Sequence, residues 1–312
     1  MVGALPAHVE AVFAESWPPR GPEDVKIARV HPALVAQLKS ALVVGDRIRV
    51  AQLPSGQLVA VDCAERQTTL ARPAVEREKT PQPLVANASD LWIVVSLVRP
   101  PLRPGLVDRF LVAAAAGGLK PRLLATKTDL AAEPEAVAWL ALYERLGFDV
   151  LRTSVVTGAG LQDLRTRLAG AFSVLVGQSG VGKSSVIRAI LPERPIAVAE
   201  LSQATGKGRH TTTVTRTYAL PEGGAVVDTP GLRELGLWGA ERAHLNRAFP
   251  DVAALATGCR FDDCRHGREP GCAVHGSPEL PVERLQSWRK LSTEIDERLR
   301  PGFGKPGGPG GR

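Results

Sequence analysis

The sequence lacks any apolar run long enough to cross a membrane. Its longest such runs, Leu91 to Val98 and Phe172 to Val176, are far shorter than the roughly 18 to 20 residues that a membrane-spanning helix needs. The first residues, MVGALPAHVEAVFAESW, also lack the early basic cluster and long apolar segment of a secretory signal. We therefore expect a cytoplasmic protein that has no membrane partner.

Cysteine is scarce as well, since the chain of 312 residues contains only four. Three of them, Cys259, Cys264 and Cys272, lie in one short stretch together with His266. The pattern C-x4-C-x-H-x5-C offers three thiolates and one imidazole, which suit a closed, tetrahedral, structural Zn²⁺ site. Free thiols or a disulfide are the alternative interpretation.

The charge is moderately basic. Lys and Arg outnumber Asp and Glu by 39 to 32, which gives a net charge of +7. Such a balance suits a phosphate-rich partner such as RNA, although charge alone could serve solubility equally well. Near the cysteines, Arg260, Arg265 and Arg268 are expected to face outward, toward RNA phosphates or toward solvent only.

Two hydrophobic patterns follow one another along the chain. The stretches VKIARV, DRIRVAQL and QLVAVDCA alternate apolar and polar residues between turn signals, and they predict a small β-barrel module. The polar stretch 76–83 is expected to be a linker. From Asn87 onward, apolar runs of strand length alternate with helical stretches such as Val107 to Ala116 and Glu133 to Leu146. This alternation predicts a parallel sheet covered on both faces.

A phosphate-binding loop follows the predicted strand FSVLV. The stretch GQSGVGKSS matches G-x-x-x-x-G-K-[ST] between a strand and a helix, the context that this motif requires. Lys183 would reach the β and γ phosphates, and the Ser184 hydroxyl would bind Mg²⁺. The residues predicted to hold the phosphates are Gly177, Gln178, Ser179, Gly180, Val181, Gly182, Lys183, Ser184 and Ser185.

Two further segments fit the γ-phosphate and metal end of a GTP site. In AVVDTPG, Asp228 would hold a water on Mg²⁺, and the Gly231 backbone N–H would face the γ phosphate. The Thr-rich loop GKGRHTTTVT lies where a GTPase has its first switch. One of Thr211, Thr212 and Thr213 should complete the Mg²⁺ shell, and the sequence leaves open which of them does so.

The best candidate for base recognition is TKTD, residues 126–129. Guanine presents an N1–H and an exocyclic amine on one edge, and the Asp129 carboxylate can accept from both. Lys127 would lie across the base or ribose, while Thr126, where Asn is usual, and Thr128 would shape the loop. Ser154 follows another predicted strand and could close on the guanine.

The order of these motifs is unusual, because TKTD precedes the phosphate loop. A nucleotide site requires its loops to be adjacent in space, which does not demand a particular order in the chain. Joining the original ends and reopening the chain between DTPG and TKTD would preserve the sheet. The second switch would then lead directly into the C-terminal region.

The permuted order TKTD, GQSGVGKSS, GRHTTT, DTPG, with a β module before it and a Cys/His cluster after it, resembles the RsgA (YjeQ) family of circularly permuted GTPases. The resemblance covers roughly residues 24 to 299. It implies an OB-fold, a permuted GTPase domain and a zinc-binding helical domain. It also implies GTP, Mg²⁺ and one Zn²⁺, and action late in maturation of the 30S subunit through its 16S rRNA.

The resulting domain hypothesis divides the chain into five parts. They are an N-terminal extension (1–22), an OB-like β-barrel (23–80), a permuted GTPase domain (84–240), a helical zinc domain (241–299) and a disordered basic tail (300–312). We expect a monomer.

Catalysis is expected to depend on a partner. Leu232 follows Gly231, where Ras-like enzymes place a glutamine that orients water, so intrinsic turnover should be slow. His210 is a candidate for positioning the water, and exposure to solvent or contact with RNA is its alternative role. Two rival functions remain at this stage: a P-loop kinase or ATPase, and an RNA-binding scaffold with a regulatory nucleotide site.

Overall fold

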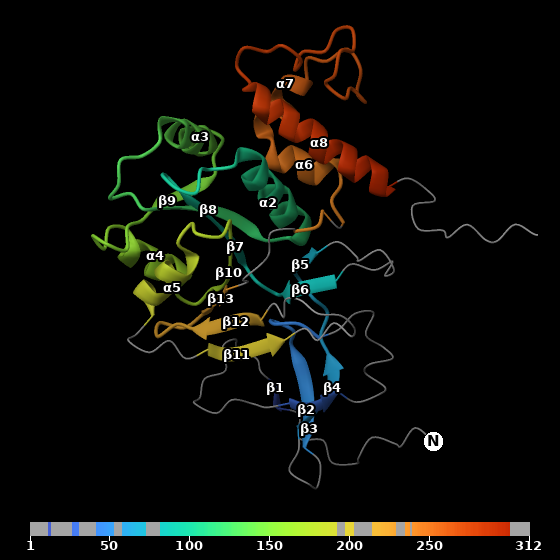
Figure 1. Ribbon diagram of the computed structural model, residues 1–312. Coiled ribbons are helices and arrows are strands. Elements are labelled where there is room, and N and C mark those ends of the chain that lie inside the picture. The colour runs from blue at the N-terminus through green and yellow to red at the C-terminus, as the bar shows by residue number, and fades with distance from the viewer. Residues whose placement is uncertain are drawn as a thin grey trace, which may run out of the picture.

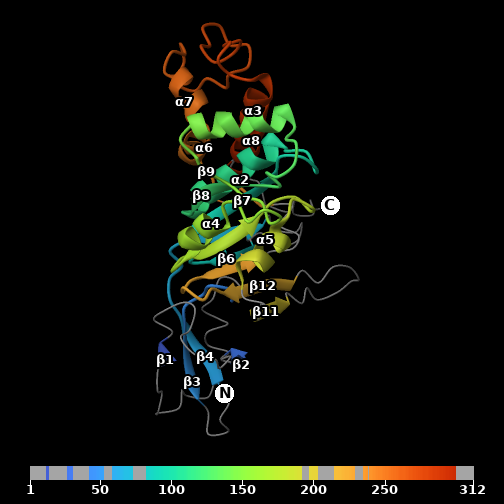
Figure 2. The ribbon, with the colours of Figure 1, turned by 90° about the vertical axis from the view of Figure 1, so that its left-hand side faces the viewer.

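The computed structural model describes residues 12–13, 27–30, 42–52, 58–72, 82–191, 197–202, 214–228, 235–237 and 239–299. Three regions follow one another from end to end in both views (Figures 1 and 2). A small β-sheet occupies one end, a seven-stranded sheet with its helices lies in the middle, and the C-terminal helices occupy the other end. No helix among the described residues is both long and apolar enough to cross a membrane.

The N-terminal sheet contains four short strands, β1 (Val12–Phe13), β2 (Ile27–Val30), β3 (Ile48–Gln52) and β4 (Leu58–Cys63), in the order β1-β3-β4-β2. Three of them lie within the stretches that the alternating pattern predicted. The antiparallel pair β5 (Thr69–Arg72) and β6 (Gln82–Ala86) follows. The linker prediction for 76–83 is therefore wrong at its end, since Gln82 and Pro83 begin β6.

The central sheet has the order β11-β12-β13-β10-β7-β8-β9. Its five parallel strands are β13 (Ala225–Asp228), β10 (Phe172–Val176), β7 (Asp90–Ser96), β8 (Lys120–Thr126) and β9 (Asp149–Arg152). Two antiparallel strands, β12 (Val214–Ala219) and β11 (Ala197–Ser202), complete one side. The chain builds β7, β8 and β9 first and then returns to β10 beside β7, so the circularly permuted α/β fold is confirmed.

Helices cover both faces of this sheet, as the buried strands require. Strand β7 shows the reason, because its alternate residues belong to two separate cores. Leu91 and Ile93 pack with α2 (Pro104–Gly117) and α3 (Pro134–Arg145). Trp92 and Val94 pack with α4 (Leu161–Leu168) and α5 (Lys183–Ile190).

The first helix of the sheet, α2, begins earlier than its apolar pattern predicts. The pattern indicated Val107 as the start, whereas the helix begins at Pro104. Proline is favourable at the first helical position, because its fixed φ suits the helix and its missing N–H would have no helical partner there.

The C-terminal region consists of α6 (Arg242–Ala248), α7 (Pro250–Ala256) and α8 (Val282–Leu299), with the cysteine-bearing loop between α7 and α8. Both α6 and α8 pack against α2 (Figure 1). The buried residues of α8 include Leu285, Trp288, Leu291 and Ile295, which recur at helical spacing. This region is therefore joined to the central sheet through α2.

Candidate functional site

The phosphate loop connects β10 to α5. Gly177 has φ +145, and a Cβ at this position would lie 2.3 Å from the Val94 carbonyl oxygen of β7, so only glycine fits here. The Lys183 ammonium lies inside the loop and donates to the carbonyls of Gly177 and Gln178, at 2.7 and 2.8 Å. Lys183 is also the first residue of α5. A helix N-terminus with its backbone N–H groups directed at the loop favours an anion.

Strand β13 brings Asp228 to the same place. Asp228 ends this strand beside Leu175 of β10, and its Oδ2 lies 3.4 Å from the Ser184 hydroxyl, which donates to it. Asp228 is buried. A hydroxyl beside a buried carboxylate at a phosphate loop is the oxygen donor set that suits Mg²⁺.

The TKTD loop is bonded directly to the phosphate loop. Thr126 is buried at the end of β8, and its hydroxyl lies 2.5 Å from the Val181 carbonyl and 3.1 Å from the Val95 carbonyl. Lys127 extends its ammonium to the Gly180 carbonyl, at 2.9 Å. Two consecutive residues of one loop thus bond to consecutive carbonyls of the other.

Asp129 is held by Ser154. The Ser154 hydroxyl donates to Asp129 Oδ1 at 2.6 Å and accepts the backbone N–H groups of Val156 and Thr157. Because a hydroxyl has one hydrogen, these two N–H groups orient that hydrogen toward the carboxylate. Ser154 is buried whereas Asp129 is exposed, so the carboxylate is both oriented and accessible.

The loop after β7 also takes part in the site, which the sequence analysis did not anticipate. Lys127 donates to the Arg99 carbonyl, and the Gln178 side-chain amide donates to the Pro101 carbonyl at 3.1 Å. The sequence feature that could have indicated this loop is the stretch VRPPLR. It directly follows a buried strand, at the sheet edge where ligands of parallel sheets bind.

Several predicted site residues lie outside the described residues. These are His210, Thr211, Thr212, Thr213, Gly231 and Leu232.

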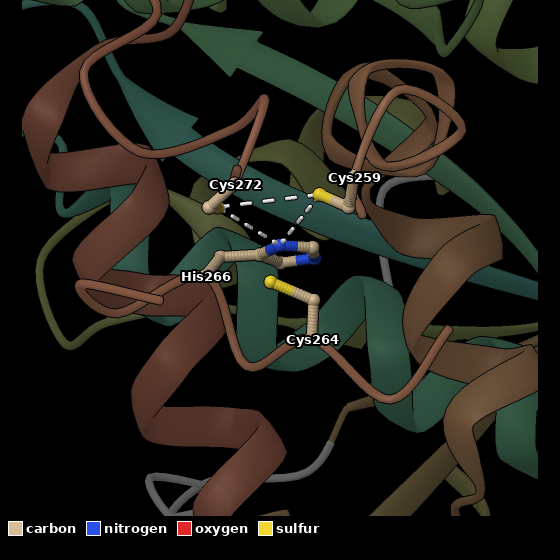
Figure 3. Close-up of side chains that lie close together, drawn as sticks. All are labelled: Cys259, Cys264, His266 and Cys272. Carbon is tan, nitrogen blue, oxygen red and sulfur yellow. Dashed lines mark hydrogen bonds between the residues drawn. The ribbon is translucent and has the colours of Figure 1, made fainter. Parts of the chain in front are cut away.

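The four predicted metal ligands come together in the C-terminal loop (Figure 3). The His266 Nδ1 lies 3.6 Å from the Cys259 sulfur and 3.7 Å from the Cys272 sulfur, and the two sulfurs are 4.0 Å apart. With Cys264, all four ligand atoms lie within 4.8 Å of one another. Zn–S bonds of about 2.3 Å and Zn–N bonds of about 2.0 Å place tetrahedral ligand atoms ~3.5 to 3.8 Å apart. The cluster therefore fits a zinc ion.

The ionisable ligands differ in their protonation when no metal ion is bound. Burial lowers the pKa of His266, and Arg242 lowers it further, so the imidazole is neutral and its nitrogen can ligate. Burial raises the pKa of the Cys264 thiol to about 11. A metal ion that binds at neutral pH must therefore displace the proton of Cys264.

A comparison with protein families decides where the chain belongs. The RsgA GTPase family model matches residues 63–238, which include the TKTD segment and the phosphate-loop motif. The chain belongs to the RsgA GTPase family. The RsgA GTPases are GTP hydrolases, and this assignment establishes the reaction class of the chain.

Similar proteins agree with the assignment to the RsgA family. The "Small ribosomal subunit biogenesis GTPase RsgA" of Pseudomonas syringae pv. tomato is 41% identical over 88% of this chain and 80% of its own length. The protein of the same name from Azotobacter vinelandii is 41% identical over 82% of this chain and 76% of its own.

Two solved structures share the fold. YjeQ from Thermotoga maritima is 28% identical with a TM-score of 0.62, covering 85% of this chain and 88% of its own. YloQ, described as a circularly permuted GTPase, is 27% identical with a TM-score of 0.59 and covers 87% of each chain.

Proposed function

We propose that this protein hydrolyses GTP during late maturation of the small ribosomal subunit, and that the particle stimulates its turnover. The names of its relatives point to this process. The observation that carries the assignment of the GTP site is the pair of hydrogen bonds from Thr126 and Lys127 to the phosphate loop. One GTP molecule can then contact Asp129 with its base and Lys183 with its phosphates.

Each described residue of the site has a role in this proposal. Asp129 accepts from guanine N1–H and the exocyclic amine, and Ser154 orients Asp129. Residues 177–185 hold the phosphates. Mg²⁺, held through Ser184 and Asp228, would neutralise charge on the β and γ phosphates.

The proposal also covers residues outside the described ranges. Thr212 or Thr213, with Thr211 as the third candidate, would complete the metal shell, and the Gly231 N–H would face the γ phosphate. His210 would position the attacking water, because Leu232 carries no hydrogen-bonding group. The intrinsic rate is therefore expected to be low.

We further propose that the C-terminal domain binds zinc and contacts 16S rRNA. The protein would be a cytoplasmic monomer with the five parts whose boundaries are given in the sequence analysis. Arg260, Arg265 and Arg268 are all exposed on the Cys/His loop. Each arginine that contacts an RNA phosphate should add about one unit to the salt dependence of binding.

GTP hydrolysis titrated with purified 30S, 50S and 70S particles tests this function. We expect strong stimulation by 30S subunits alone, and competition for the site by GDP but not by ATP. Lys183→Ala is the matched control, which should keep its fold and zinc but lose tight GTP binding. Equal rates with and without 30S subunits would contradict the proposal, and preference for ATP would indicate a kinase or ATPase.

The role of His210 is tested separately. His210→Ala should lower the 30S-stimulated rate by about 100-fold, the lower range for a positioned proton acceptor, while GTP affinity stays unchanged. A stimulated rate equal to that of the unsubstituted protein would leave His210 a surface or RNA-contacting role.

A further inference from the structure

Helix α8 contributes two adjacent residues to the surroundings of His266. The Arg289 guanidinium donates from Nε to the His266 carbonyl at 2.8 Å, and its Nη2 donates to the same carbonyl and to that of Gly267. The ring of Trp288 lies 4.5 Å from the imidazole of His266, centroid to centroid. Both His266 and Trp288 are buried.

The backbone of His266 needs such support. Its φ is +56, in the left-handed region that non-glycine residues rarely adopt. This conformation brings the Cβ of a non-glycine residue close to the following carbonyl oxygen and is therefore strained. The forked donor of Arg289 holds the carbonyls of His266 and of the next residue, so the strained turn is fixed from outside the loop.

Arg289 also reaches the part of the loop that carries Cys272. Its Nη2 lies 3.0 Å from His275 Nδ1, and the backbone N–H of His275 donates to the Cys272 sulfur at 3.3 Å. A guanidinium can only donate, so Nδ1 of His275 is the acceptor in this contact. One side chain therefore contacts His266, which is a ligand, and His275, whose backbone N–H bonds the ligand Cys272.

We propose that Arg289 is a positioning residue of the metal centre, which orders His266 and Cys272 in their ligating geometry before the ion binds. Trp288 supports it by fixing the plane of the imidazole. The proposal rests on zinc being the ion that the Cys/His cluster holds. It makes zinc affinity depend on the docking of α8, a helix that supplies none of the four ligands.

Zinc affinity of the full-length protein tests the proposal. Arg289→Met removes the forked donor but keeps the aliphatic stem, and it should weaken Zn²⁺ binding about 10- to 100-fold, the usual effect of losing a group that orients a ligand. Arg289→Lys keeps the charge and should show an intermediate loss. Lys290→Met is the control. Lys290 is the next residue of α8 and is exposed, and its substitution removes one positive charge, as Arg289→Met does.

Affinities would be measured by competition with a chromogenic chelator, and the ligand set by the absorption spectrum of the Co²⁺-substituted protein. The Arg289→Met protein should retain the spectrum of three thiolates and one imidazole at saturating Co²⁺, which shows that the fold and ligands persist. If Arg289→Met does not fold, the zinc affinity of Arg289→Lys provides the test.

The proposal is overturned if both Arg289 variants bind zinc as tightly as the unsubstituted protein, or if Lys290→Met loses as much affinity. An unsubstituted protein that binds no zinc overturns it too. GTP hydrolysis with 30S subunits is measured separately. A protein that binds zinc but shows no hydrolysis would contradict the proposed function and not the role of Arg289.

Discussion

The Thr126 hydroxyl, together with the Lys127 ammonium, bonds the two loops of the candidate nucleotide site to each other. Thr126 stands where Asn is usual in this motif, and its hydroxyl reaches the Val181 carbonyl of the phosphate loop. Thr126 is buried, so water cannot replace that contact without cost. Threonine at this position therefore supplies a buried bond between the two loops.

Thr126→Val should weaken binding of a fluorescent GDP analogue about tenfold. The substitution keeps the shape of the side chain but leaves the Val181 carbonyl without this donor, which costs about 1 to 3 kcal/mol when buried. Thr166→Val is the control, because its hydroxyl donates to the Gln162 carbonyl on the exposed face of α4. Unchanged affinity in Thr126→Val would mean that the two loops do not need this bond.

At the scale of elements, the turn before β3 packs closely against the end of β6. The Val44 carbonyl accepts the Ala86 N–H at 2.9 Å, and the Asn87 side chain donates to the Gly45 carbonyl at 2.8 Å. Gly45 has φ +91, and a Cβ there would lie 1.9 Å from the Ala86 carbonyl oxygen. The turn before β3 therefore meets the end of β6 through a close backbone contact that no larger residue at position 45 permits.

Gly45→Ala should destabilise the protein by several kcal/mol, whereas Gly147→Ala should cost about 1 to 2 kcal/mol. Gly147 has a similar φ of +86, but a Cβ added there would meet nothing within 4 Å, so the pair separates steric overlap from backbone strain. Urea unfolding would measure both. Equal losses would show that the contact between Gly45 and Ala86 gives way at little cost.

At the scale of the whole molecule, Arg284 ties the C-terminal helices to the central sheet. This fully buried residue of α8 bonds Asp108 of α2 and Asp251 of α7, and its guanidinium lies 3.9 Å from the Phe249 ring centroid. The Tyr143 hydroxyl of α3 donates to the same Asp108 carboxylate at 2.9 Å. Four helices therefore share one buried charge network.

Arg284→Met should lower the free energy of unfolding by about 3 to 5 kcal/mol, because two acidic groups lose their buried cation. Arg109→Met is the comparison, since its pair with Glu294 joins the same helices α2 and α8 but is partly exposed, and such pairs contribute about 0 to 1 kcal/mol. Urea unfolding of the zinc-loaded proteins measures the difference. Similar losses would mean that burial adds nothing to the Arg284 network.

The amino-acid sequence by itself determined the features whose chemistry lies in neighbouring residues. The phosphate loop, the TKTD segment and the Cys/His cluster each combine required residue types at short spacing, and the apolar runs determined a buried parallel sheet. The reversed motif order was also visible, because it is a property of the chain itself.

Only the tertiary structure decided which distant groups meet. The bond of Thr126 to Val181, the exclusion of any side chain at Gly45 and the contact of Arg289 with His266 join residues from separate elements. Arg284 stands among the many charged residues of α8, yet it is fully buried. A periodic pattern of apolar and polar residues predicts that charged side chains face solvent. A charged side chain can be buried only where the fold brings partners to it from other helices.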